Sequence, residues 1–175
     1  WTQWPQANIA LATDGFVVLD GDAKHPYETS IAALEQQYGP LPQDTPLVHS
    51  GGGGSHRYMA YPPDGLSLPS VNGKVGVGLD IKSFQGLITA PPSWHIAGQQ
   101  YTWDALFSLD AFPLAVCPQW LADLARAPAS GQGHAYTSGV VIPEGERYQY
   151  LIALAGRLRY SGLDEEEIYQ GLVIG

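Results

Sequence analysis

Two aspartates that follow an apolar run are the first candidates for chemistry. Asp20 and Asp22 come directly after the segment 16–19, which reads Phe-Val-Val-Leu. In an extended strand, residues i and i+2 face the same side, about 6.6 Å apart along the chain. Carboxylates held so close repel each other unless a cation lies between them, and hard divalent ions prefer oxygen ligands. The pair is a candidate metal site, although Asp-Gly-Asp is also a common turn sequence.

A third acid lies inside another strand-like segment. Asp80 is flanked by Leu79 and Ile81, and aspartate is disfavoured in strands both by propensity and by burial. Two interpretations stay open. Asp80 either completes a two-metal carboxylate set with Asp20 and Asp22, as in polymerases and nucleases, or it is exposed on an edge strand.

Four consecutive glycines precede a histidine in the segment 50–56, Ser-Gly-Gly-Gly-Gly-Ser-His. Glycine lets main-chain N–H groups approach an anion without hindrance from side chains. The candidate phosphate contacts are Ser50, Gly53, Gly54, Ser55 and His56. The segment lacks the Gly-Lys-Ser/Thr ending and the following helix of a P-loop. A loose hairpin loop followed by an ordinary histidine is the alternative.

Further candidate phosphate donors lie beside these residues. Arg57 and Lys82 are scarce cations next to His56 and Ile81, and Ser93 and His95 face one side if their segment is extended. Solvated side chains are the alternative for the two cations. Tyr101 and Trp103 alternate and have the spacing to stack on a nucleobase, with core packing as the alternative.

Short strands and two helices are expected to position these groups. Apolar runs and alternation predict strands over 16–19, 56–61, 75–81, 86–90 and 100–103. Helical spacing predicts one helix over 29–38, ended by Gly39-Pro40, and another after Pro118. The sequence therefore predicts an α+β domain with a mostly antiparallel sheet that carries the carboxylates and has helices behind it.

The C-terminal part of the chain reads differently. Residues 127–139 have the composition of a linker, and leucines at helical spacing follow from 151. The acidic run 164–167 has the pattern of a capping box that opens a further helix. We therefore predict a first domain over 1–126 and a helical segment over 140–175. The opening Trp1, in place of Met, indicates a fragment of a longer protein.

Composition restricts the classes of function. The chain of 175 residues carries 8 Lys+Arg against 17 Asp+Glu, a net charge of -9, and one cysteine. This acidic balance argues against a purely electrostatic nucleic-acid binder. A single cysteine excludes a disulfide framework and is typical of a reducing compartment, so we expect a cytoplasmic protein. No apolar run reaches the roughly 18 residues of a membrane span, and no membrane partner is expected.

The order of these segments resembles the bifunctional primase–polymerase domain of plasmids, phages and other mobile elements, a branch of the archaeo-eukaryotic primase superfamily. The matching segments are Trp4–Thr13, Val17–Asp22, Ser50–Tyr58, Gly78–Lys82, Ala90–His95 and Tyr101–Trp103. Each is weak alone, but six in the right order over about a hundred residues form a specific signal. The segments 142–147, 154–156 and 162–168 resemble the helical domain that commonly follows in these primases.

The resemblance implies an RRM-like primase sheet, here without its N-terminal part. It implies that Asp20, Asp22 and Asp80 bind two Mg²⁺ or Mn²⁺ ions and are catalytic together with His56. His56 and the glycine turn before it match the motif that contacts the nucleotide's phosphates. Members often carry a Lys or Arg within this turn, where this chain has only glycine.

Ser93 and His95 belong to a further motif, which the resemblance associates with the nucleotide site. The implied reaction is template-directed nucleotidyl transfer, as a DNA primase and DNA polymerase, on a single-stranded DNA template with nucleoside triphosphates. A helicase domain or other replication proteins would be its partners. Two alternatives stay open: a non-catalytic module of a larger replication protein that binds nucleotide or template, and a metal-dependent nuclease that uses the same acids.

Overall fold

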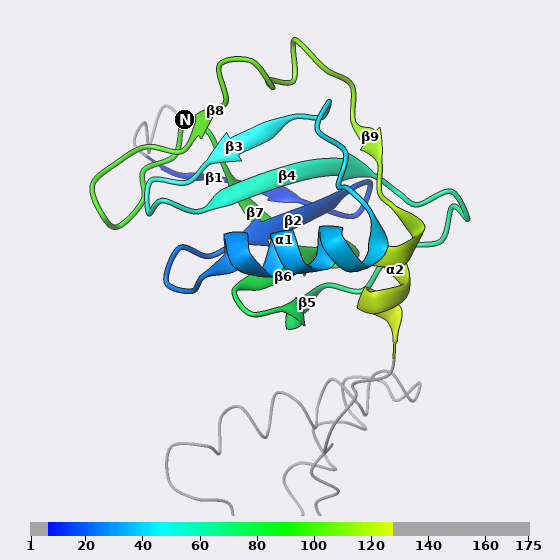
Figure 1. Cartoon of the computed structure of the whole chain (residues 1–175). Coiled ribbons are helices and arrows are strands. Elements are labelled where there is room, and N and C mark those ends of the chain that lie inside the picture. Colours follow the sequence, from blue (N-terminus) through cyan, green and yellow to red (C-terminus); the bar gives the residue numbers. More distant parts are fainter. Residues whose placement is uncertain (1–6, 128–175) are drawn as a thin grey trace, which may run out of the picture. The chain divides into compact units, whose positions relative to one another are not determined.

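A seven-stranded, mostly antiparallel sheet forms the centre of the computed structural model, which describes residues 7–127 (Figure 1). The strand order is β5-β6-β2-β4-β3-β8, and β9 pairs in parallel with β4. The strands are β2 Val17–Gly21, β3 Leu47–His49, β4 Ser55–Ala60, β5 Val71–Gly76, β6 Leu79–Lys82, β8 Thr102–Trp103 and β9 Ala115–Val116. A separate antiparallel pair joins β1 (Ile9–Ala12) to β7 (Leu87–Ala90).

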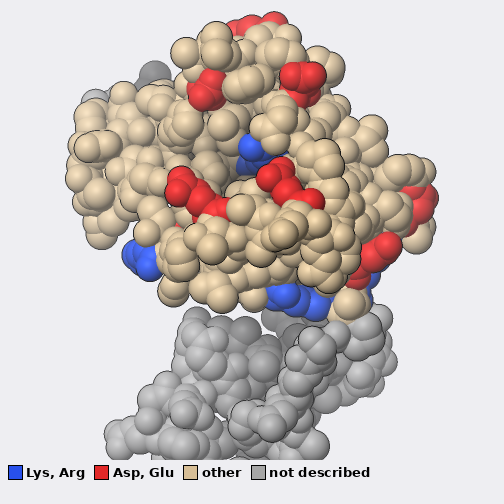
Figure 2. Space-filling view, viewed as in Figure 1, with Lys and Arg blue, Asp and Glu red and all other residues tan. Residues whose placement is uncertain are grey.

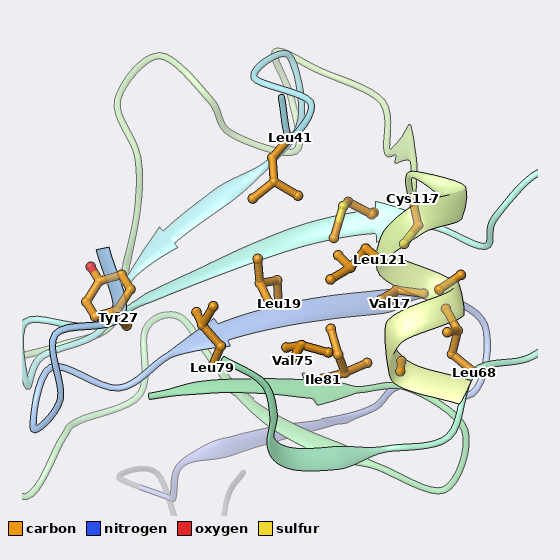
Figure 3. Packing of buried hydrophobic residues seen from close by; sticks show 13 residues of the cluster. Val17, Leu19, Tyr27, Leu41, Leu68, Val75, Leu79, Ile81, Cys117 and Leu121 are labelled. Atoms are coloured by element: carbon orange, nitrogen blue, oxygen red, sulfur yellow. The ribbon is translucent and has the colours of Figure 1, made fainter. Parts of the chain in front are cut away.

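The two helices, α1 (Tyr27–Tyr38) and α2 (Gln119–Arg126), cover one face of the main sheet (Figure 1). Strand residues alternate between the faces, so Leu19 of β2 and Ile81 of β6 point toward the helices and are buried. They pack in one apolar cluster with Tyr27 of α1 and Leu121 of α2 (Figure 3). Burial of this apolar surface holds the sheet and the helices together.

The opposite face of the main sheet carries a second apolar cluster. It contains Val18, Val48, Tyr58 and Ile88, with Trp103 packed against it. Because Ile88 belongs to β7, the small β1–β7 sheet lies over this face (Figure 1). The main sheet therefore carries an apolar cluster on each face. A polar side chain on one of these strands is an exception to this pattern and needs a structural or functional reason.

The predicted α+β architecture with a mostly antiparallel sheet is confirmed, and so are both helices before residue 127. The strand predicted over 75–81 is wrong, because β5 and β6 are separate strands joined by a turn at Val77 and Gly78. Gly78 has φ 73°, and a Cβ there would lie 2.6 Å from the Cβ of His25, so the chain turns where only glycine fits. The short strands β1, β3 and β9 were not predicted.

The RRM-like arrangement stays a prediction. The predicted linker over 127–139 and helical segment over 140–175 fall outside the described residues, apart from residue 127 itself. Among residues 7–127, neither helix has the length and apolar character needed to cross a membrane.

Candidate active site

A row of polar side chains crosses three strands on the face away from the helices. Asp20 of β2 lies directly opposite Asp80 of β6 on one side and directly opposite His56 of β4 on the other. Residues opposed in this way share a face, with Cβ atoms about 4.5–5.5 Å apart. Since β6 lies between β5 and β2, the interpretation of Asp80 as an exposed edge residue is wrong.

These side chains line a cavity of about 320 Å³. Asp22, directly after β2, lines the same cavity, and its Oδ1 accepts a hydrogen bond from the main-chain N–H of Lys24 at 3.0 Å. Asp22 therefore forms the turn and borders the cavity at once. The other predicted residues that line it are Ser50, Gly54, Lys82 and His95. The structure thus brings the three carboxylates and the imidazole of His56 together.

Burial and neighbouring charges shift the protonation of the two central groups in opposite directions. Burial raises the pKa of Asp20 to about 6, Asp80 and Asp22 add to the rise, and Lys82 opposes it. Burial lowers the pKa of His56 to about 4, and Lys82 lowers it further. His56 is therefore a neutral imidazole at pH 7, with one donor and one acceptor nitrogen.

Asp80 is held by contacts from its own strand and from β5. Its Oδ1 accepts a hydrogen bond from the N–H of Gly73 at 2.8 Å, and its Oδ2 lies 2.9 Å from Nζ of Lys82. That Nζ also donates to Oδ1 of Asn72 at 2.8 Å. Asn72 and Gly73 lie in the irregular part of β5, where the register with β6 shifts between Val71 and Gly76. A bulge of this kind redirects main-chain donors, and here it directs one at Asp80.

Sequence reasoning missed the role of Asn72 and Gly73. The available signal was the Asn-Gly dipeptide, which often marks a turn or an interrupted strand. Its contact with Asp80 depends on how β5 registers against β6, which the sequence does not specify. Other cavity residues that the sequence did not single out are Lys24 and Thr89, and Gly52 of the predicted glycine run also lines the cavity.

Main-chain atoms approach two glycines of the run, Gly51 and Gly54, so closely that a Cβ would collide with them. A Cβ on Gly54 would lie 2.2 Å from the main-chain oxygen of Gly21, and one on Gly52 would lie 2.8 Å from Cε1 of His95. The N–H of Gly53 donates to the carbonyl oxygen of Ser50 at 3.0 Å, and that of Gly54 donates to its Oγ at 2.9 Å. Both N–H groups are thus used within the turn.

Four of the predicted residues are absent from the cavity lining: Gly53, Ser55, Arg57 and Ser93. Arg57 follows His56 in β4 and therefore points to the helix-covered face, where its guanidinium donates to the carbonyl oxygen of Pro42 at 2.6 Å. The expectation that Arg57 shares the site with His56 is not met. Ser93 is buried, and its Oγ accepts a hydrogen bond from the N–H of Ile9 at 2.8 Å, which ties the β7 end to β1.

Ser55 begins β4 opposite Gly21 and is also absent from the cavity wall.

The two aromatic residues with the spacing to stack on a base, Tyr101 and Trp103, have different surroundings. Tyr101 lines the cavity between two imidazoles, with its ring centroid 5.5 Å from that of His56 and 5.8 Å from that of His95. Trp103 packs on Tyr58 in the second apolar cluster, so core packing holds for this residue.

The donor chemistry of the cavity fits a divalent cation. Asp20, Asp22 and Asp80 offer the carboxylate oxygens that Mg²⁺ and Mn²⁺ prefer, and an ammonium group already contacts Asp80. Within residues 7–127, however, no three His, Cys, Asp or Glu side chains converge as a metal-binding group. The ligands share one cavity without being gathered around one point.

This fold and site define an α+β domain in which the sheet presents carboxylates and a histidine to one cavity. The chain matches the family described as bifunctional DNA primase/polymerase, N-terminal, over residues 1–120, and it belongs to that family. The resemblance stated from its motifs is thereby confirmed for this part of the chain. No match was found among curated proteins or among solved structures.

Membership places the chain among DNA primases and polymerases, a nucleotidyltransferase-type family that acts on DNA and nucleotides and generally depends on divalent metal. The family match ends at residue 120. The likeness of residues 142–168 to a primase helical domain therefore stays a prediction.

Proposed function

We propose that this chain catalyses template-directed nucleotidyl transfer by a two-metal-ion mechanism, both starting and extending a DNA strand. One observation carries the proposal: Asp20 is opposed by Asp80 and by His56 across adjacent strands, and all three line one cavity. This row supplies metal ligands and a phosphate donor at neighbouring positions, and family membership supplies the reaction class.

Each residue of the row has a distinct task in this proposal. Asp20, Asp22 and Asp80 are the oxygen ligands of the two ions. When bound, Mg²⁺ or Mn²⁺ ions activate the attacking 3′-hydroxyl and neutralise charge on the departing pyrophosphate. Asp20 must lose its proton to act as a ligand, which its pKa of about 6 allows at neutral pH.

His56 is the proposed contact to the triphosphate. It is buried, its Nδ1 has no hydrogen-bond partner within the described residues, and it remains neutral at pH 7. A buried polar atom without a partner costs free energy unless a ligand or water satisfies it. Lys82 and His95 line the same cavity and are the further proposed contacts. Arg57, Ser93 and the N–H groups of Gly53 and Gly54 have no place in this arrangement.

A single-stranded DNA template is the proposed partner, and it would approach over an uncharged surface. Residues 83–103 contain no Asp, Glu, Lys or Arg, in a chain whose net charge is -9. This stretch supplies Leu87, His95 and Tyr101 to the cavity wall, and its Trp94, which precedes His95 in the chain, is exposed. On the helix-covered side, which Figure 2 shows, basic groups are few and spaced apart. Because residues 83–103 add no cation, contacts to bases rather than to many phosphates would bind the strand.

The biological setting follows from the motif resemblance and belongs to the proposal. We propose a role in replicating a plasmid, phage or other mobile element, with a helicase domain or other replication proteins as partners.

Product sizing tests the proposed reaction. The chain is incubated with single-stranded template, Mn²⁺ and either ribo- or deoxynucleotides, with and without a primer. We expect labelled products longer than the primer, and their loss in Asp20→Asn and Asp80→Asn. Asp44→Asn is the matched control, because Asp44 lies outside the cavity lining. Extension by the doubly substituted Asp20→Asn/Asp80→Asn protein would contradict the mechanism.

The same assay separates the alternatives. Shortening of labelled DNA without any need for nucleoside triphosphates would identify a nuclease. Nucleotide binding in calorimetry, with neither extension nor shortening, would identify a non-catalytic binding module.

A further inference from the structure

Both carboxylate oxygens of Asp80 already have partners in the protein. Oδ1 accepts the N–H of Gly73, and Oδ2 contacts the ammonium group of Lys82 at 2.9 Å. The side chains of Lys82 and Asp80 are 21% and 31% exposed, so solvent screens this ion pair only in part. Each oxygen keeps a second lone pair, but an ammonium group 2.9 Å from Oδ2 repels any other cation that approaches this oxygen, so a divalent ion binds there only if the ammonium group moves away.

The two contacts differ in how easily they can be broken. The Gly73 donor belongs to the main chain of β5, which is fixed by its pairing with β6. The Lys82 donor is the end of a flexible side chain, and its Nζ has a second anchor on Oδ1 of Asn72 at 2.8 Å. Oδ2 is therefore the oxygen that can change partner. The ammonium group of Lys82 can break its contact with Oδ2 and keep its hydrogen bond to Asn72.

Two carboxylates that face each other need a cation nearby to offset their repulsion. Asp20 lies directly opposite Asp80, and like charges directly opposed on neighbouring strands destabilise a sheet. Lys82 is two residues from Asp80 on the same face of β6 and lies directly opposite Val18, which is two residues from Asp20 on the same face of β2. Its ammonium group offsets the repulsion between the two carboxylates.

We propose that Lys82 is an internal counter-ion which holds Asp80 in the metal-free protein and which a divalent ion must displace from Oδ2. Gly73 keeps Oδ1 in place during the exchange, so the ion receives one oxygen of Asp80 at a fixed position. Lys82 stays near Asn72 and faces the cavity in which the triphosphate would lie. This inference rests on the proposed function, and it accounts for the carboxylates not converging in the described residues.

Titration of the protein with Mn²⁺ alone tests the exchange, with free Mn²⁺ followed by electron paramagnetic resonance and no nucleotide or DNA present. Lys82→Met removes the competing cation, so we expect Mn²⁺ to bind about tenfold more tightly, the effect of losing one hydrogen bond to a charged group. Lys82→Arg keeps the charge and is expected to bind no more tightly than the wild type. Thermal unfolding confirms that each variant is folded.

Lys24→Met is the matched control. Lys24 lines the same cavity, but within residues 7–127 its ammonium group forms no ion pair. This variant removes the same charge without freeing a ligand, and we expect it to change Mn²⁺ affinity less than twofold. Equal gains in Lys82→Met and Lys24→Met would show a general charge effect and overturn the counter-ion role, as would no gain in either.

Asp80→Asn separates failure of this inference from failure of the proposed function. If Asp80→Asn weakens Mn²⁺ binding but Lys82→Met leaves it unchanged, Asp80 is a ligand and the exchange is wrong. If Asp80→Asn leaves Mn²⁺ binding unchanged, the proposed metal site fails and the inference fails with it.

Discussion

Asp20 and His56 face each other across β2 and β4 with Oδ1 and Nε2 3.5 Å apart, yet their pKa values are shifted in the directions that oppose an ion pair. Asp20 is ionised only above about pH 6, and His56 is protonated only below about pH 4. Burial causes both shifts, because it disfavours whichever form is charged. Asp20 therefore does not gain a counter-ion from His56, and the cation nearest to the two opposed carboxylates within the described residues is Lys82.

The raised pKa of Asp20 predicts a stability that changes with pH in an unusual direction. The native carboxyl binds its proton more tightly than the unfolded one, whose pKa is 3.8. The free energy of unfolding therefore falls as the pH rises from about 4 to about 6, and the loss is complete above that range. Asp20→Asn cannot ionise, so we expect it to be more stable than the wild type by about 1–3 kcal/mol at pH 7.5.

Urea unfolding in the presence of a chelator measures this difference at two pH values. At pH 4 the advantage of Asp20→Asn should disappear, because the wild-type carboxyl is then protonated. An advantage that is the same at pH 4 and pH 7.5 would mean that removal of the charge is not its cause.

The same proton competes with a divalent ion. Asp20 must be ionised to bind Mn²⁺, so we expect affinity to be constant above about pH 6.5 and to fall by about tenfold per pH unit below pH 6. Calorimetric titrations between pH 5 and pH 8 check this. An affinity that stays constant down to pH 5, as expected for a ligand with the ordinary pKa of an aspartate, would show that Asp20 is not the titrating ligand.

How far the site could be predicted depends on which physical rule places each residue. Asp20 was placed by a local rule, because it ends an apolar strand. Asp80 was not, because its place beside Asp20 depends on β6 pairing with β2, and strand order is not visible in composition or spacing. Spacing alone left two interpretations of Asp80, and only the resemblance to a family favoured the one that joins it to Asp20; the structure then placed the two residues on one face.

The position of Arg57 could have been predicted from the sequence by the alternation of side chains along a strand. Neighbouring residues in a strand face opposite sides, so a strand that directs His56 into the site directs Arg57 away from it. The glycine run shows the reverse case. Its composition suggested an anion cradle, but Gly54 is required by its approach to the Gly21 main chain, a long-range contact that no local pattern contains.

Gly54 therefore predicts a mutational effect on stability. Gly54→Ala would place a Cβ 2.2 Å from the main-chain oxygen of Gly21, which cannot move without disturbing β2. We expect a loss of about 1–3 kcal/mol in the free energy of unfolding, as for other overpacked sites. Gly15→Ala is the matched control, since nothing lies within 4 Å of its Cβ position. Chemical unfolding compares the two, and equal stability would contradict the close packing of the glycine turn.

Trp94 gives the prediction for the template. It is 51% exposed, and its main chain is held by Asn8, whose Oδ1 accepts the Trp94 N–H and whose Nδ2 donates to the Trp94 carbonyl oxygen, both at 2.9 Å. An exposed indole on a fixed main chain is suited to stacking on a base, and its uncharged neighbourhood does not repel a polyanion. We expect Trp94→Ala to weaken binding of a labelled single-stranded oligonucleotide by about 1–3 kcal/mol.

Fluorescence anisotropy without metal or nucleotide measures this effect apart from catalysis. Leu106→Ala is the matched control, because Leu106 is 72% exposed but lies outside the uncharged stretch. Affinity carried by stacking depends only weakly on salt, whereas affinity carried by phosphate contacts falls steeply with it. A steep salt dependence together with unchanged binding in Trp94→Ala would therefore place the template on the basic side chains and away from this surface.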